Sequence, residues 1–100
     1  MVIVVKGSDV ALEEPGDLKG FKVVVEEGDE TSVGEALARV GHLADRETAW
    51  IRAEAVREMA AGRVPDGWSE DFQATLDYAA TKGWLSDDGA EIQAHIEWPA

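Results

Sequence analysis

The sequence predicts a small single α+β domain, and three observations lead to this prediction. Residues 90–98 alternate between apolar and polar side chains, which is typical of a strand with one buried face. Residues 2–5 form a short β-branched run that suits a strand. Apolar residues recur at helical spacing within residues 33–40 and 72–80. A chain of 100 residues is long enough for one domain with a modest core, spanning residues 1–100.

Residues 1–31 are predicted to contain two strands and an acidic turn. The first strand, residues 2–5, is apolar throughout and is expected to be covered on both faces. Glycine and proline punctuate residues 7–20, which predicts a loop. The second strand is residues 21–25, and we expect it to pair with the first as an antiparallel hairpin with a long connection. Residues 26–30 lack calcium-ligand spacing and are predicted to be a solvated acidic turn.

The first helix is predicted from a capping pattern and an apolar stripe. Ser32 and Glu35 have the spacing of a capping box, with Ser32 as the N-cap. Apolar side chains from residue 33 to residue 40 form the stripe, and Gly41 is expected to end the helix. The polar residues 42–47 then form a connection.

Residues 46–61 permit two interpretations. Read as one helix, their apolar side chains fall on one stripe. Read as a strand followed by a helix, Trp50 and Ile51 join a sheet and residues 53–61 form the helix. The second interpretation is favoured because Thr48, Trp50 and Ile51 cluster, and because a third strand would complete a sheet with the C-terminal hairpin.

A longer helix and a hairpin are predicted for the last third of the chain. Ser69 is the expected N-cap, and the helix ends near Gly83. Its apolar stripe consists of Phe72, Leu76, Ala79 and Ala80.

The hairpin that follows is predicted to turn at two residues, Asp88 and Gly89. This turn would place Leu85 opposite Ile92 and give Gly89 a positive φ. The strand beyond it would point its alternate apolar side chains, from residue 90 to residue 98, into the core.

From residue 32 onward the predicted order is helix, short strand, helix, helix and hairpin. This order resembles a winged-helix domain, with residues 84–98 as the wing, and the resemblance covers residues 32–100. It implies that the helix from Ser69 to Lys82 takes the position of a recognition helix, which presents basic and amide side chains to DNA in binding members of the family. That helix instead carries three acidic side chains: Glu70, Asp71 and Asp77. We therefore expect no direct binding to nucleic acid.

The charge of the chain is strongly negative and unevenly distributed. Nine basic and 21 acidic residues give a net charge of −12, which favours a partner with a basic surface and repels nucleic acid and anionic lipid. All arginines lie between residues 39 and 63, a segment with balanced charge. Arg52, Arg57 and Arg63 are therefore the candidate anion-binding residues. The alternative is that they pair with surface glutamates.

Few residues suggest chemistry. His42 and Asp45 could form an acid–base pair on a loop, or His42 could be a surface residue just past a helix. The chain has no cysteine, no zinc-protease spacing and no nucleotide-binding fingerprint, so no catalytic residue, metal site or cofactor is predicted. The apolar run at the N-terminus is too short for a signal peptide or a membrane span, so we expect a soluble cytoplasmic protein.

Tryptophan is the most informative residue type, with four in 100 residues. Most are expected in the core, whereas Trp68 and Trp98 are predicted to remain partly exposed and to contact a partner, together with the acidic side chains of the third helix. The leading hypothesis is a non-catalytic interaction or accessory protein whose partner has a basic surface or is a second copy. The alternatives are a nucleic-acid mimic that binds a basic protein groove, and a small enzyme or ligand-binding domain that uses His42, Asp45 and the arginine-bearing segment.

Overall fold

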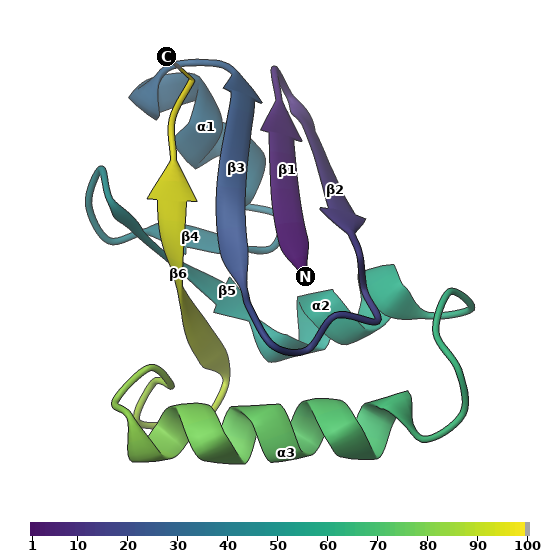
Figure 1. Ribbon diagram of the computed structural model, residues 1–100. Helices are drawn as coiled ribbons and strands as arrows, with labels where there is room; N and C mark the ends of the chain where they lie inside the picture. Colours follow the sequence, from purple (N-terminus) through teal and green to yellow (C-terminus); the bar gives the residue numbers. More distant parts are fainter. Residues whose placement is uncertain (100) are drawn as a thin grey trace.

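Six strands form one mixed sheet in the computed structural model, which describes residues 1–99. Their order across the sheet is β2-β1-β3-β6-β5-β4. The strands are β1 (Val2–Lys6), β2 (Asp9–Glu13), β3 (Lys22–Glu27), β4 (Gly41–Leu43), β5 (Thr48–Arg52) and β6 (Glu91–Glu97). β1, β3 and β6 run parallel, whereas β2, β5 and β4 each run antiparallel to the neighbour nearer the centre. The sheet curls, so β4 and β5 pass behind β3 and β6 in Figure 1.

Three helices accompany the sheet: α1 (Glu30–Leu37), α2 (Ala53–Ala60) and α3 (Trp68–Thr81). α3 is the longest and lies across the ends of the strands where β3 and β6 begin (Figure 1). Over residues 1–99, no helix has the length and apolar character needed to cross a membrane.

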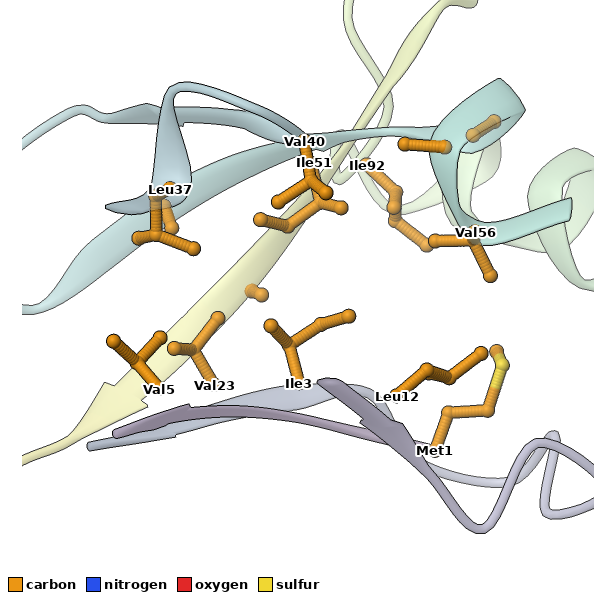
Figure 2. Packing of buried hydrophobic residues seen from close by; sticks show 14 of the residues in the cluster. Met1, Ile3, Val5, Leu12, Val23, Leu37, Val40, Ile51, Val56 and Ile92 are labelled. Atoms are coloured by element: carbon orange, nitrogen blue, oxygen red, sulfur yellow. The ribbon is translucent and has the colours of Figure 1, made fainter. Parts of the chain in front are cut away.

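The core fills the space enclosed by the curled sheet. Figure 2 shows Ile3, Val5 and Val23 pointing from one side of this space toward Leu37 and Ile51 on the other. All of these side chains are fully buried, and burial of each is worth about 1.5–3 kcal/mol. One core connects both halves of the curl, so the chain is a single α+β domain, as predicted.

The strands of the N-terminal third differ from the prediction in their number and in their pairing. Residues 9–13, predicted as loop, form the edge strand β2, and β1 and β3 pair in parallel rather than antiparallel. The two differences have one cause. Because β2 returns antiparallel along one edge of β1, the chain comes back to the end where β1 begins, and β3 must then run parallel to β1 on its other edge. Val2 and Val4 face outward and are only half-buried, so β1 is not covered on both faces, contrary to the prediction. The predicted acidic turn at residues 26–30 is also shorter, because Glu26 and Glu27 belong to β3 and Glu30 begins α1.

α1 begins earlier than predicted because Asp29, not Ser32, is its N-cap. The Asp29 carboxylate accepts a hydrogen bond from the Ser32 amide at 2.9 Å, and the Asp29 amide donates to Ser32 Oγ at 3.0 Å. Ser32 is therefore the distal member of the capping box. α1 ends at Leu37, and Gly41 opens the short strand β4 instead of closing the helix.

The middle of the chain follows the favoured interpretation. Residues 48–52 form β5 and residues 53–60 form α2, so the strand-then-helix prediction is confirmed. In α3, Phe72, Leu76 and Ala79 are buried as predicted, but Ala80 is exposed.

α3 starts at Trp68 after Gly67, so Ser69 is not its N-cap. The Ser69 hydroxyl accepts a hydrogen bond from Arg57 instead, at 2.7 Å.

The hairpin has the predicted pairing but a different turn. Leu85 lies opposite Ile92, as expected. The Gly89 amide donates to the Ser86 carbonyl at 2.8 Å, so Asp87 and Asp88 are the central turn residues and Gly89 follows them with φ of +74°. The connection is therefore a four-residue loop built around a turn, and the predicted two-residue turn is wrong.

β6 alternates as predicted but belongs to a larger sheet than a wing. Ile92, Ala94 and Ile96 are buried, and the intervening residues face outward. Ala90, also predicted to point into the core, is exposed, and Trp98 is half-buried. Because β6 pairs with both β3 and β5, and because β2 and β4 were not predicted, the winged-helix order is not confirmed.

Candidate functional site

The two tryptophans predicted to be exposed both have intramolecular partners. Trp68 is buried, stacks on Phe72 with ring centroids 4.9 Å apart, and donates its indole N–H to the Pro15 carbonyl at 2.6 Å. The prediction that Trp68 is exposed is therefore wrong. Trp98 is half-buried, and the Arg46 guanidinium lies 4.6 Å above its ring.

The acidic side chains predicted to meet a partner lie on the solvent side of α3. Glu70, Asp71 and Asp77 are all exposed. Asp77 accepts a hydrogen bond from the Gln73 amide at 3.1 Å. Their role in binding remains a prediction.

The three candidate anion-binding arginines contact different parts of the fold. Arg52 donates to the Arg39 carbonyl. Arg57 donates to the Gln73 side chain at 2.9 Å in addition to Ser69, beside a hollow of about 390 Å³. Arg63 donates to the carbonyl of Leu12 in β2 at 2.8 Å. Each guanidinium therefore binds neutral groups of this chain, and the structure does not bring the three together.

His42 and Asp45 also have separate partners. His42 Nδ1 lies 3.1 Å from a carboxylate oxygen of Glu91, across the outer face of the sheet. The Asp45 carboxylate accepts from the Glu47 amide at 2.8 Å. Among residues 1–99, no cluster of three or more His, Cys, Asp or Glu side chains could hold a metal ion.

A hollow lies between α3, β6 and the β2–β3 connection, and we call it the β6 cleft. Its volume is about 510 Å³, within the range of sites that bind small ligands or inserted side chains. Its apolar lining consists of Met1, Leu18, Phe21, Ala79, Ile92 and Ala94. Its polar lining consists of Lys19, Thr48, Thr75, Gln93 and His95.

The cleft forms because two segments pair with neighbouring parts of the same edge of β6, and each then turns away from the strand. The Trp84 backbone carbonyl accepts a hydrogen bond from the Gln93 amide at 2.7 Å, and Lys22 of β3 is paired with His95. The chain before Trp84 turns away into α3, whereas the chain before Lys22 turns into the β2–β3 connection (Figure 1). The edge of β6 between Gln93 and His95 thus lies at the base of a crevice. In open α/β sheets, ligands bind in a similar crevice where the chain connections of neighbouring strands turn in opposite directions.

Two aromatic side chains of the cleft are exposed to an unusual degree. Tyr78 is 57% exposed and Trp84 is 46% exposed. Their ring centroids lie 6.2 Å apart with planes at 68°, an edge-to-face contact. The Lys82 ammonium lies 5.5 Å from the Tyr78 ring centroid.

The wall formed by the β2–β3 connection is fixed by backbone contacts. The Met1 amino group donates to the carbonyl oxygens of Asp17 at 2.6 Å and Gly20 at 2.9 Å. Burial lowers the pKa of this amino group. On the opposite wall, the Thr75 hydroxyl donates to the Asp71 carbonyl at 3.1 Å.

Tyr78 and Trp84 were not singled out from the sequence, although a signal was present. Tyr78 is two positions from Leu76, which places it on the opposite side of the helix from the buried stripe. Trp84 precedes Leu85 in an extended segment, so once Leu85 faces the core, Trp84 must face outward. The cleft itself depends on contacts between distant segments and has no local signal.

Comparison of this chain with models of known protein families, with curated proteins and with solved structures finds no match. The candidate site therefore rests on the geometry of the β6 cleft alone.

Proposed function

We propose that this protein is a non-catalytic interaction module that binds a segment of a partner protein in the β6 cleft. The observation that carries this proposal is the pair of half-exposed aromatic rings, Tyr78 and Trp84, on an apolar cleft. Tyrosine and tryptophan are enriched among the residues that dominate binding energy at protein interfaces. An apolar floor with a few polar groups at its sides suits an inserted side chain.

The net charge of −12 favours a partner with a basic surface. Three acidic side chains of α3, Glu70, Asp71 and Asp77, lie exposed on the helix that forms one wall of the cleft. A second copy of the chain would bring another −12 charges to the same surface, so a basic partner is favoured over self-association. The same charge supports the expectation that the protein does not bind nucleic acid directly.

A peptide-display selection tests the proposal without a known partner. Random peptides are selected on the wild-type protein, with counter-selection on a Tyr78→Ala/Trp84→Ser double variant. Because both side chains are half-exposed, the double variant is expected to fold. Trp98 was a candidate partner contact from the sequence, but it is half-buried and does not line the cleft, so it is not assigned to the binding surface. Trp98→Phe therefore serves as the matched control.

The expected result is enrichment of peptides with positive net charge. Their affinity should fall about tenfold or more in the double variant, as loss of a central aromatic contact does, and should remain unchanged in Trp98→Phe. It should also weaken at high salt. Enrichment that is equal on the wild type and on the double variant would show that the cleft is not the binding surface.

A further inference from the structure

The interior of the β6 cleft differs in charge from the rest of the molecule. Among residues 1–99, no acidic side chain lines it, although 21 of the 100 residues in the sequence are acidic. The basic groups of its lining residues are Lys19, His95 and the amino group of Met1. A cationic side chain inside the cleft would meet these groups and no carboxylate, and an acidic one would enter against the net negative charge of the protein. The interior therefore suits an uncharged apolar side chain.

Several aromatic rings of this protein, two of them partly exposed and one buried, are covered by cations of the chain itself. Arg46 lies over Trp98, Arg57 lies over Phe72 at 4.9 Å, and Lys82 lies over Tyr78. Within residues 1–99, no cation of the chain lies over Trp84, although its side chain is 46% exposed. Trp84 is thus a half-exposed ring, in edge-to-face contact with Tyr78, of the residue type that attracts cations best.

Charges close to Trp84 in the chain favour a cation there. Asp87 and Asp88 lie in the turn three and four residues later. Asp88 accepts hydrogen bonds from the Ser86 hydroxyl at 2.7 Å and the Ala90 amide at 3.0 Å, and these bonds lower its pKa, so it stays ionised. The neighbouring positive group is Lys82, which lies at Tyr78.

Resting on the proposed function, we propose that the partner segment carries an apolar side chain beside an arginine, with the apolar side chain in the β6 cleft and the guanidinium on the ring of Trp84. Arginine fits better than lysine because its planar, weakly hydrated guanidinium stacks on an aromatic face. The apolar side chain lies against Ala79, Ile92 and Ala94.

Three blocked dipeptides test this assignment by amide and indole NMR titration of the labelled protein. The probes are acetyl-Leu-Arg-amide, its citrulline analogue, which is neutral but nearly isosteric, and acetyl-Ala-Arg-amide. The wild-type protein should bind the first about threefold or more tighter than the citrulline analogue, as a partly exposed cation–π contact allows. It should also bind the first at least about fivefold tighter than the alanine analogue, because the leucine side chain is larger and apolar.

Protein variants separate the two contacts. Trp84→Leu keeps an apolar side chain but removes the aromatic face, so it should abolish discrimination between arginine and citrulline while keeping that between leucine and alanine. Thr75→Trp introduces a large side chain at a half-buried position of the cleft and should abolish discrimination between leucine and alanine. Trp98→Phe is the control and should behave as the wild type.

Equal affinity for the arginine and citrulline probes in the wild type would overturn the assignment, as would arginine selectivity that survives in Trp84→Leu. Equal affinity of the wild-type protein for the leucine and alanine probes would overturn the assignment of an apolar side chain to the β6 cleft. If either assignment fails but display-selected peptides still require Tyr78 and Trp84 for binding, the proposed function stands. Failure of the assignment and failure of the proposed function are therefore distinguishable.

Discussion

Gly41→Ala is expected to destabilise the protein strongly, although it adds one methyl group. Gly41 pairs with Ile51 where β4 lies against β5. A Cβ atom at this position would lie 1.9 Å from the Trp50 carbonyl oxygen and 2.9 Å from Ile51 Cα. Since real Cβ contacts stay above 3.0 Å and these neighbours are backbone, the two strands must separate by about 1 Å or more.

The loss of unfolding free energy can be worked out from the contacts that are disturbed when β4 and β5 separate. Overpacking costs about 1–3 kcal/mol. Each backbone hydrogen bond weakened beside it costs about 0.5–1.5 kcal/mol, and the bond from the Arg52 amide to the Val40 carbonyl at 2.7 Å lies directly next to Gly41. The total is roughly 2–5 kcal/mol, against a typical stability of about 5–15 kcal/mol. In a domain of this size Tm should fall by about 10 °C or more.

Gly34→Ala is the matched control, because it adds the same methyl group within α1. A Cβ atom there would lie 3.6 Å from Leu43 Cδ1, an ordinary contact. Replacing glycine by alanine within a helix should stabilise the protein by about 0.5–1 kcal/mol. Urea and thermal unfolding followed by circular dichroism measure both variants. Equal stability of the Gly41→Ala and Gly34→Ala variants would refute the close approach of β4 to the Trp50 backbone.

Three further predictions concern the core, the first helix and nucleic acid. Leu76→Ala removes a side chain that is 4% exposed and should cost about 2–5 kcal/mol in denaturant unfolding, whereas an unchanged midpoint would mean that the phase of α3 is wrong. Asp29→Ala should lower Tm at neutral pH. The Ser32 hydrogen bonds lower the Asp29 pKa below its ordinary value of 3.8, so the deficit should be full above that pH and shrink as the carboxylate is protonated below it. A deficit independent of pH, or one that Asp29→Asn shares in full at neutral pH, would contradict the charged cap. Duplex DNA should show no binding by fluorescence anisotropy at about 0.15 M salt, and sub-micromolar affinity would contradict the electrostatic argument.

The parts of the fold with local signals were predictable from the sequence. The alternation of β6 predicted its buried face, because a strand has period two and a slip of one residue would expose Ile92 and Ile96. It overextended the strand by one residue at each end. The cluster of Thr48, Trp50 and Ile51 identified β5. The stripe of α3 was correct except at Ala80, which lies one position beyond the buried Ala79 and on the edge of the apolar face.

The errors lie where distant segments decide the outcome. β2 is rich in acidic residues and flanked by glycine and proline, so its strand conformation depends on pairing with β1. Parallel pairing of β1 and β3 follows from the position of β2 and has no pattern of its own. Asp29 and Ser32, three residues apart, are both of residue types that cap helices, so the residue type alone does not decide which of them caps α1.

The candidate site was mispredicted for the same reason. Trp68 follows proline and glycine and looked like a loop residue, yet the carbonyl of Pro15, far away in the sequence, accepts its indole N–H. The positions of Tyr78 and Trp84 followed from periodicity, but the cleft that gives them a role arises where β3 and the segment before β6 diverge. Such a divergence is a property of the sheet topology.

NMR mapping of a display-selected peptide locates the binding surface most directly. If the β6 cleft is that surface, the largest shifts occur at the amides of Thr75, Tyr78 and Gln93 and at the indole N–H of Trp84. Residues on the far edge of the sheet, such as His42, should keep the chemical shifts of the unbound protein. Shifts that are largest at β4 or β2, with the Trp84 indole unmoved, would contradict binding in the cleft.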